Sequence, residues 1–323
     1  MKTTVYGAAH FWVDLCCALL LYRHFTDHTA WLTILLFYNF CAFALQLPFG
    51  ILADRLDRNG TVAAAGMLLT ALSFTCVRLP LASAVLAGCG NALFHVGGGI
   101  EILNRSVHKA FRLGFFVAPG ALGLFLGTKI GESDLLLWPF PAVLAITAIL
   151  LLFLAHKPSG NAAPQLSLHP ALLALTGVVV LRSYLGFCMV FRWNTTPLAA
   201  LLAVLALALG KAAGGLLLDR FGYLTTSLCS LLAAACFLLK PHLMITGLLG
   251  LFFFQMTMPV TLWAAAKCCG GAKGFSFGLL TFGLFIGFLP ILFGLRLPAD
   301  GLFLAAGTLL SLPLLCLGGR CAR

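Results

Sequence analysis

The chain has 323 residues, of which 61% are hydrophobic and only 9% are charged. Soluble domains carry about 25% charged residues, so this composition excludes a soluble protein and leaves no room for a separate soluble domain. The net charge of +11 would suit a nucleic-acid binder, but the distribution of the charges along the chain accounts for it without one.

Apolar runs fill nearly the whole chain, and each approaches or exceeds the roughly 20 residues that a membrane-spanning helix needs. The first half holds runs at 6–22, 30–53, 61–77, 81–104, 111–130 and 135–155. The second half holds runs at 170–191, 197–218, 223–239, 242–266, 275–295 and 301–317. A polar linker at 158–168 separates them. We therefore expect an all-α polytopic membrane protein with two six-helix bundles, 1–157 and 169–323.

The cysteines argue against a metal site, and the N-terminal residues argue against a signal peptide. The twelve cysteines form no C-x-x-C pair and no Cys/His spacing typical of a metal site, so we expect no metal site and no cofactor. Most lie in apolar runs, where free cysteine acts as a small hydrophobe. Asp14 interrupts the first run, which lacks a small-residue cleavage site, and this indicates a retained first helix rather than a signal peptide.

The positive charges predict the topology, because lysine and arginine are enriched in cytoplasmic loops. With the N-terminus in the cytoplasm, twelve of the twenty lie on that side, six lie on the other, and two lie inside spans. We therefore expect both termini and the linker to be cytoplasmic, in a plasma or inner membrane. The expected contacts are the lipid bilayer, a small-molecule substrate and protons, with no nucleic acid, for a chain that acts as a monomer.

A short charged stretch after the second run is repeated in the second half. Residues 50–60 read GILADRLDRNG and residues 215–222 read GLLLDRFG. The matching pairs, all offset by 165 residues, are Gly50 with Gly215, Leu52 with Leu217, Asp54 with Asp219, and Arg55 with Arg220. The first copy departs at Asp57, where the second has Gly222. A repeat at half the chain length indicates two homologous halves.

This pattern, Gly-x-Leu-x-Asp-Arg-x-Gly between membrane helices, resembles the loop 2–3 signature of the major facilitator superfamily and its loop 8–9 echo. The resemblance implies twelve helices in two bundles related by pseudo-twofold symmetry. It also implies that Asp54 locks one state by contacting the start of the eleventh helix, near 274–276, and a base such as Arg112 or Lys109. Helix N-termini attract carboxylates. The alternative is that this charged stretch, which includes Arg58, serves only to set the membrane topology.

Four charged residues fall inside predicted spans, namely Asp14, Glu101, Arg182 and Lys211. A charge at bilayer depth costs about 3 kcal/mol or more, so we expect these residues to have functions. Both acids lie in the first half and both bases in the second. This division suggests neutralisation between the halves, where the architecture places its substrate cavity.

A proton site is predicted around Asp14. His10 lies one turn earlier on the same helix face, and histidine titrates near neutral pH. In the fourth run Asn91 and His95 share a face, and Phe-His followed by glycine resembles the fourth helix of fosmidomycin-resistance-type transporters, with Val96 in place of the usual proline.

Each of these polar groups has a structural alternative. The His10–Asp14 pair could only tether two helices, His95 could make an interhelical hydrogen bond, and Glu101 could pair with Arg105. The glycines around Asn91 permit either close helix approach or a local break that exposes backbone to a cavity.

Arg182 is the best single candidate for an anionic substrate contact, because guanidinium groups bind carboxylate and phosphate in a fork. A fixed salt bridge to Asp14 is the alternative. Lys211 could extend its amine to the membrane surface instead. The further substrate-site candidates are Asn91, Tyr184, Gln255 and Trp263, although residues of the last two types more often serve packing within helices.

The fifth run contains Pro119, Gly120 and Gly123, which resemble the Pro-Gly motif in helix 5 of drug/proton antiporters of the same superfamily. The physical need is a bend with small residues for tight packing, and a kinked helix alone also explains it. The resemblance favours export.

These features predict a proton-coupled secondary active transporter of a small organic solute, with an anionic group favoured by Arg182, that works by alternating access and favours export. A proton symporter that imports a small organic acid is the first alternative. The sequence contains no H-E-x-x-H and no G-x-S-x-G motif, so no enzymatic activity is expected. It has no long soluble segment typical of a receptor.

Overall fold

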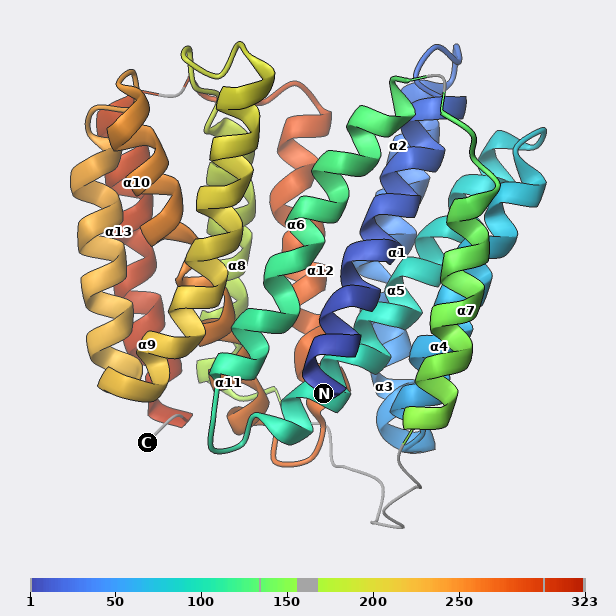
Figure 1. Ribbon diagram of the computed structural model, residues 1–323. Coiled ribbons are helices and arrows are strands. Elements are labelled where there is room, and N and C mark those ends of the chain that lie inside the picture. The colour runs from blue at the N-terminus through green and yellow to red at the C-terminus, as the bar shows by residue number, and fades with distance from the viewer. Residues whose placement is uncertain (1, 134, 156–167, 299, 322–323) are drawn as a thin grey trace. The chain divides into compact units, whose positions relative to one another are not determined.

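The computed structural model describes residues 2–133, 135–155, 168–298 and 300–321, and every regular element in these ranges is a helix (Figure 1). The predicted linker, 158–168, lies outside the described residues except for Leu168. The predicted division of the chain at that linker stays a prediction.

The helices follow the predicted runs closely. The elements of the first half are α1 (Lys2–His24), α2 (Trp31–Asn39), the π-helix η1 (Phe40–Ala44), α3 (Gln46–Leu56), α4 (Asn59–Ser73), the 3-10 helix η2 (Phe74–Cys76), α5 (Pro80–Arg105), α6 (Phe111–Gly131) and α7 (Pro139–Leu154). Those of the second half are α8 (Pro170–Cys188), α9 (Pro197–Leu238), α10 (Met244–Gln255), α11 (Thr257–Cys268), α12 (Lys273–Leu292), α13 (Gly301–Gly318) and the 3-10 helix η3 (Gly319–Cys321).

Ten helical stretches in the described ranges are long and apolar enough to cross a membrane, by length and composition. One of them, Pro197–Leu238, consists of two helices joined across a kink at Gly222. A shorter apolar helix, Pro139–Leu154, follows the sixth predicted run. The protein is therefore a multi-pass membrane protein.

Three predicted runs are less regular than their sequences suggest. The second run contains the π-helix η1, an insertion that is often found at functional positions. The tenth run is divided into α10 and α11. At that division Pro259 has no N–H to donate to the carbonyl of Gln255. The eighth and ninth runs meet at Gly222 without an intervening loop.

The structure resolves into two compact units. Unit 1 comprises Met1–Asn104, Pro119–Gln165 and Gly271–Phe282, and unit 2 comprises Arg105–Ala118, Leu166–Gly270 and Gly283–Arg323. Helices α6 and α12 each contribute one part to each unit. The start of α6 therefore belongs to unit 2, and the start of α12 belongs to unit 1.

Glycines allow the helices of each unit to approach closely. In unit 1 a Cβ at Gly66 would lie 2.5 Å from the carbonyl oxygen of Gly90, and one at Gly97 would lie 2.5 Å from the amide nitrogen of Ala63. Helix α5 runs unbroken through its glycines. Of the two roles open to them, close packing against α4 is therefore the one observed.

The backbone conformations of Asp57 and Gly222 explain why the two copies of the repeated stretch differ at this position. Asp57 and Gly222 both have positive φ, and Asp57 is the only non-glycine with positive φ among the described residues. Asp57 has φ 48° and ψ 35°, the left-handed helical region that aspartate tolerates. Gly222 has φ 77° and ψ 175°, a region that is essentially restricted to glycine. The first copy can therefore replace glycine and the second cannot.

Candidate functional site

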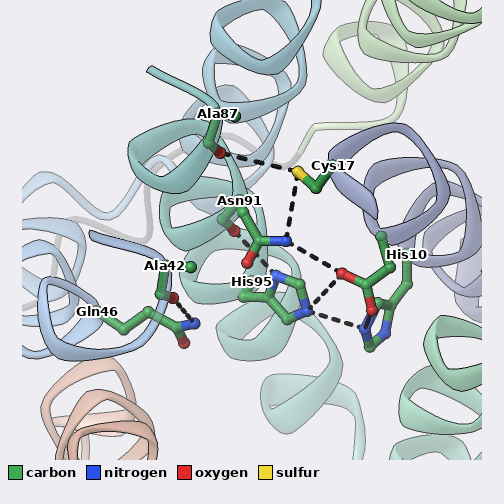
Figure 2. A network of polar contacts seen from close by, with 8 residues as sticks. His10, Cys17, Ala42, Gln46, Ala87, Asn91 and His95 are labelled. Carbon is green, nitrogen blue, oxygen red and sulfur yellow. Dashed lines mark hydrogen bonds and ion pairs between the residues drawn. The ribbon is translucent and has the colours of Figure 1, made fainter. Parts of the chain in front are cut away.

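A cluster of polar side chains connects α1 and α5 within unit 1 (Figure 2). The Asp14 carboxylate lies 3.1 Å from Nε2 of His10, 3.7 Å from Nε2 of His95, and accepts a hydrogen bond of 3.1 Å from Nδ2 of Asn91. Asn91 also lies 3.8 Å from the sulfur of Cys17. The faces that the sequence assigned separately to His10–Asp14 and to Asn91–His95 therefore face each other.

The hydrogen-bond partners of His95 decide which ring nitrogen carries hydrogen. Its Nδ1 lies 2.9 Å from the backbone carbonyl of Asn91, which can only accept, so Nδ1 is protonated. In neutral His95 the Nε2 lone pair then faces Nε2 of His10 at 2.8 Å, and His10 must donate. One hydrogen thus lies between two imidazole nitrogens, beside the Asp14 carboxylate.

The cluster is enclosed rather than solvated. His10 is 5% exposed and Asn91 is 3% exposed, while the side chains of His95 and Asp14 are 15% and 19% exposed. The partly exposed side chains, His95 and Asp14, are therefore those that could exchange a proton with solvent. The buried side chains, His10 and Asn91, hold them in position.

Helix α6 packs over the cluster at Gly120, the glycine that follows Pro119 in the fifth run. A Cβ at Gly120 would overlap Nε2 of His10 and Oδ2 of Asp14. One helical turn further, a Cβ at Gly123 would overlap the backbone of Phe11. The Pro-Gly motif, which includes the in-helix Pro119, therefore leaves the space that the His10–Asp14 pair occupies. Sequence reasoning predicted tight packing here but did not connect it to Asp14.

The same donor set could hold a divalent metal ion. Ligand atoms of His10, Asp14 and His95 all lie within 4.8 Å of one another. Two imidazoles and a carboxylate are ligands that zinc and similar ions accept. The sequence predicted no metal site, because these ligands come from two helices with no recognisable spacing.

Glu101 does not belong to this cluster. It lies six residues beyond His95 in α5, about 9 Å along the helix axis, and is 4% exposed. Its predicted part in proton coupling stays a prediction.

Arg182 is the buried charge of unit 2. It lies in α8, is 7% exposed, and donates from Nη1 to the hydroxyl of Thr261 in α11 at 3.2 Å. Sequence reasoning missed Thr261, because a threonine in an apolar helix carries no signal by itself.

The other substrate-site candidates are spread over unit 2. Tyr184 donates to the carbonyl of Leu295 at 3.1 Å, and the indole of Trp263 donates to the carbonyl of Ser106 at 3.2 Å. Gln255 is half-buried at the end of α10, and Lys211 is half-buried within α9. Their contact with a substrate stays a prediction.

Asp54 caps the start of α12 within unit 1. Its two carboxylate oxygens accept hydrogen bonds from the backbone N–H groups of Gly274 (2.7 Å) and Phe275 (2.8 Å). A Cβ at Gly50 would overlap the Gly274 carbonyl, so the glycine permits the approach. The predicted contact of Asp54 with this helix start is confirmed, and its gating role stays a prediction. We call these four residues the α3–α12 clamp.

Asp219 makes the same arrangement with α6 within unit 2. Its carboxylate accepts hydrogen bonds from the N–H groups of Ala110 (2.6 Å) and Phe111 (3.0 Å). A Cβ at Gly215 would lie 3.0 Å from Cα of Phe111. We call these four residues the α9–α6 clamp.

Lys109 and Arg112, the bases expected beside Asp54, are part of unit 2, and their contact with Asp54 stays a prediction. Lys109 and Arg112 flank Ala110 and Phe111 in the α9–α6 clamp, and Arg112 donates to the carbonyl of Arg105. Their expected place beside Asp54 came from the family resemblance.

No family model and no curated protein matches the sequence. The similarities to known proteins are therefore those to solved structures. The Escherichia coli fucose:proton symporter FucP matches over 100% of this chain and 98% of its own, with TM-score 0.68 and 14% identity. A second structure of FucP, described as a major facilitator superfamily transporter in the outward conformation, matches with TM-score 0.64 and 15% identity. The chain has the fold of the major facilitator superfamily.

Two further solved structures share this fold. The human organic anion transporter MFSD10 matches over 97% of this chain and 99% of its own, with TM-score 0.72 and 16% identity. A bacterial homologue of the iron transporter ferroportin, in the outward-facing state, matches over 100% and 99%, with TM-score 0.70 and 13% identity. The predicted all-α polytopic fold is confirmed, and with it the resemblance drawn from the repeated stretch.

Proposed function

We propose that the protein is a secondary active transporter that moves a small organic solute by alternating access, coupled to protons and favouring export. The observation that carries the proposal is the His10–Asp14–His95 cluster, joined by Asn91 within one unit of a transporter fold. All the solved structures compared above are of transporters.

The chemistry of the cluster supports proton coupling. Without an added proton it consists of one carboxylate and two neutral imidazoles, so it carries a net negative charge inside a low-dielectric span. One added proton makes the cluster neutral, and the cost of holding it away from water falls. The loaded and unloaded forms thus differ by a charge, and a transporter can couple that difference to its change of state.

The direction rests on the fifth helix. Pro119, Gly120 and Gly123 resemble the motif of drug/proton antiporters, and Gly120 contacts the proposed proton site itself. Import remains the alternative, supported by the fucose:proton symporter among the solved structures. Counterflow in vesicles of known orientation distinguishes the two directions.

The clamps supply a means of holding one state. Each joins a carboxylate to two backbone N–H groups at a helix start, and both bonds must break if that helix start moves away. We propose that they set the balance between states rather than bind the solute.

The test begins with a thermal-shift screen of the purified protein against small organic solutes, followed by reconstitution in proteoliposomes. With a pH gradient the wild type should accumulate the solute. Asp14→Asn should bind the solute and exchange it at equal pH on both sides, but should fail to accumulate it. The matched control is Glu132→Gln, because Glu132 is an exposed acid paired only with Lys129.

Two results would contradict this assignment. Accumulation by Asp14→Asn at the wild-type rate would make the carboxylate a structural tether. Stoichiometric retention of Zn²⁺ or Mn²⁺ by the wild type, lost in Asp14→Asn and unaffected by a pH gradient, would make the cluster a metal site instead.

A further inference from the structure

Arg182 is buried in a unit that holds no acid near it. Unit 2 contains two acidic side chains, Asp219 and Asp300. Asp219 binds the start of α6, and Asp300 caps α13 by accepting from the N–H of Phe303. Both acids are therefore engaged at helix starts, and Arg182 lies inside α8. The guanidinium has no counter-charge from the described side chains of its own unit.

Among the described residues of unit 2, the hydrogen-bonding capacity of Arg182 is also largely unused. A guanidinium has five N–H donors, and the one hydrogen bond that Arg182 makes to a described side chain of its unit goes to Thr261. The hydroxyl of Thr261 donates to the carbonyl of Thr257 at 3.0 Å or of Met258 at 2.9 Å. It accepts from Arg182 with a lone pair and thus aligns the group without neutralising it.

Neighbouring contacts fix the direction in which Arg182 can act. Ser183, the next residue, donates to the carbonyl of Leu284 in α12 at 2.7 Å, and Gly287 packs against the side chain of Ser183. One face of α8 is thereby held against α12. The guanidinium is held toward α11, so it is positioned before any ligand arrives.

We infer that Arg182, aligned by Thr261, is the binding site for the oxyanion group of the transported solute, which is an organic anion with a carboxylate or a phosphonate. The inference rests on the proposed transport function and specifies its substrate class. The planar fork of arginine matches both groups with paired, charge-assisted hydrogen bonds, and the anion supplies the charge that unit 2 lacks.

The first test needs no ligand. An arginine that is ion-paired is strongly destabilising to remove, whereas an unpaired buried charge is not. The melting temperature of the ligand-free Arg182→Gln protein should therefore equal or exceed that of the wild type. A clear fall would show that Arg182 is a structural tether, and the inference would be wrong.

The second test uses benzoate and phenylphosphonate, with benzamide and benzyl alcohol as uncharged counterparts. At least one anion should raise the melting temperature of the wild type more than its counterpart does, and the better anion identifies the preferred group. In Arg182→Gln its affinity should fall about ten- to a hundredfold, as for a lost charge-assisted pair. Arg182→Lys should recover only part of it, and Arg192→Gln, at an exposed arginine of the same unit, should behave as the wild type.

The outcomes separate this inference from the proposed function. Stabilisation by neither anion, or equal stabilisation of Arg182→Gln, overturns the anion site. Binding is measured without a pH gradient, so failure of proton coupling in the Asp14 experiment leaves this result unchanged. Conversely, a neutral solute that is accumulated by a pH gradient would keep the proposed function and overturn the anion site.

Discussion

The two units place buried polar groups on corresponding helices but use different chemistry. In unit 1 the groups lie on α1 and α5, the first and fourth spans of the first half. In unit 2 they lie on α8 and α11, in the first and fourth spans of the second half. An acid with two imidazoles stands in one unit, and a guanidinium with a hydroxyl stands in the other.

The net charges of the two units differ in the same direction as these buried groups, because unit 2 is the more basic. Unit 2 holds twelve of the twenty lysines and arginines but two of the nine acids, and unit 1 holds the remaining eight and seven. The clamps, by contrast, are alike in both units. We therefore assign control of the conformational state to the repeated elements, and we assign the proton and the anion to the elements that differ.

The largest effect is expected from Gly120→Val, which should disable unit 1 alone. The added side chain would overlap His10 and Asp14, so it should separate the two and abolish accumulation driven by a pH gradient. Anion binding at Arg182 should persist in a thermal-shift assay. Gly186→Val is the matched control, because a Cβ at Gly186 meets nothing within 4 Å.

The next largest effect should come from the clamps, and it should be equal in the two units. Asp54→Asn and Asp219→Asn each replace one acceptor oxygen by an NH₂ group facing a backbone N–H, so each should slow transport several-fold while leaving solute affinity unchanged. Transport rates and binding in the same preparation check this. The second copy of the stretch is shorter in sequence, but its carboxylate makes the same two bonds. Wild-type transport by both variants would reduce the clamps to topology signals.

The smallest effect concerns the position where the first copy of the stretch has Asp57 and the second has Gly222. Gly222→Asp should lower the free energy of unfolding by about 2 kcal/mol, because an L side chain at φ 77° and ψ 175° is strained. Asp57→Gly should change it by less than about 1 kcal/mol, since aspartate already tolerates its left-handed conformation. Unfolding of the purified variants would contradict this if both changes cost the same.

The fold was readable from the sequence because its signals are local. Apolar run length and the offset of 165 residues between Asp54 and Asp219 need no knowledge of packing. The i, i+4 spacing likewise placed His10 with Asp14 and Asn91 with His95 correctly.

The assembly of the site was not readable, because it depends on which helix faces meet. Nothing local shows that the α1 and α5 faces share one hydrogen, that Gly120 covers them, or that Thr261 aligns Arg182. The assignment of Lys109 and Arg112 to Asp54 came from the family resemblance and stays a prediction. The π-helix in the second run was likewise not predicted from its sequence.

The clamps have a consequence for how the sequence can drift. Each carboxylate binds backbone N–H groups, which every residue except proline provides, so substitution of a partner side chain leaves the bond in place. The hydrogen bonds themselves therefore do not restrict Ala110, Phe111 and Phe275, whereas replacing the two aspartates or the glycines one turn before them would disturb the contact. A sequence search among distant relatives should therefore recognise the aspartate and the preceding glycine of each clamp, but not the residues whose N–H groups the aspartate binds.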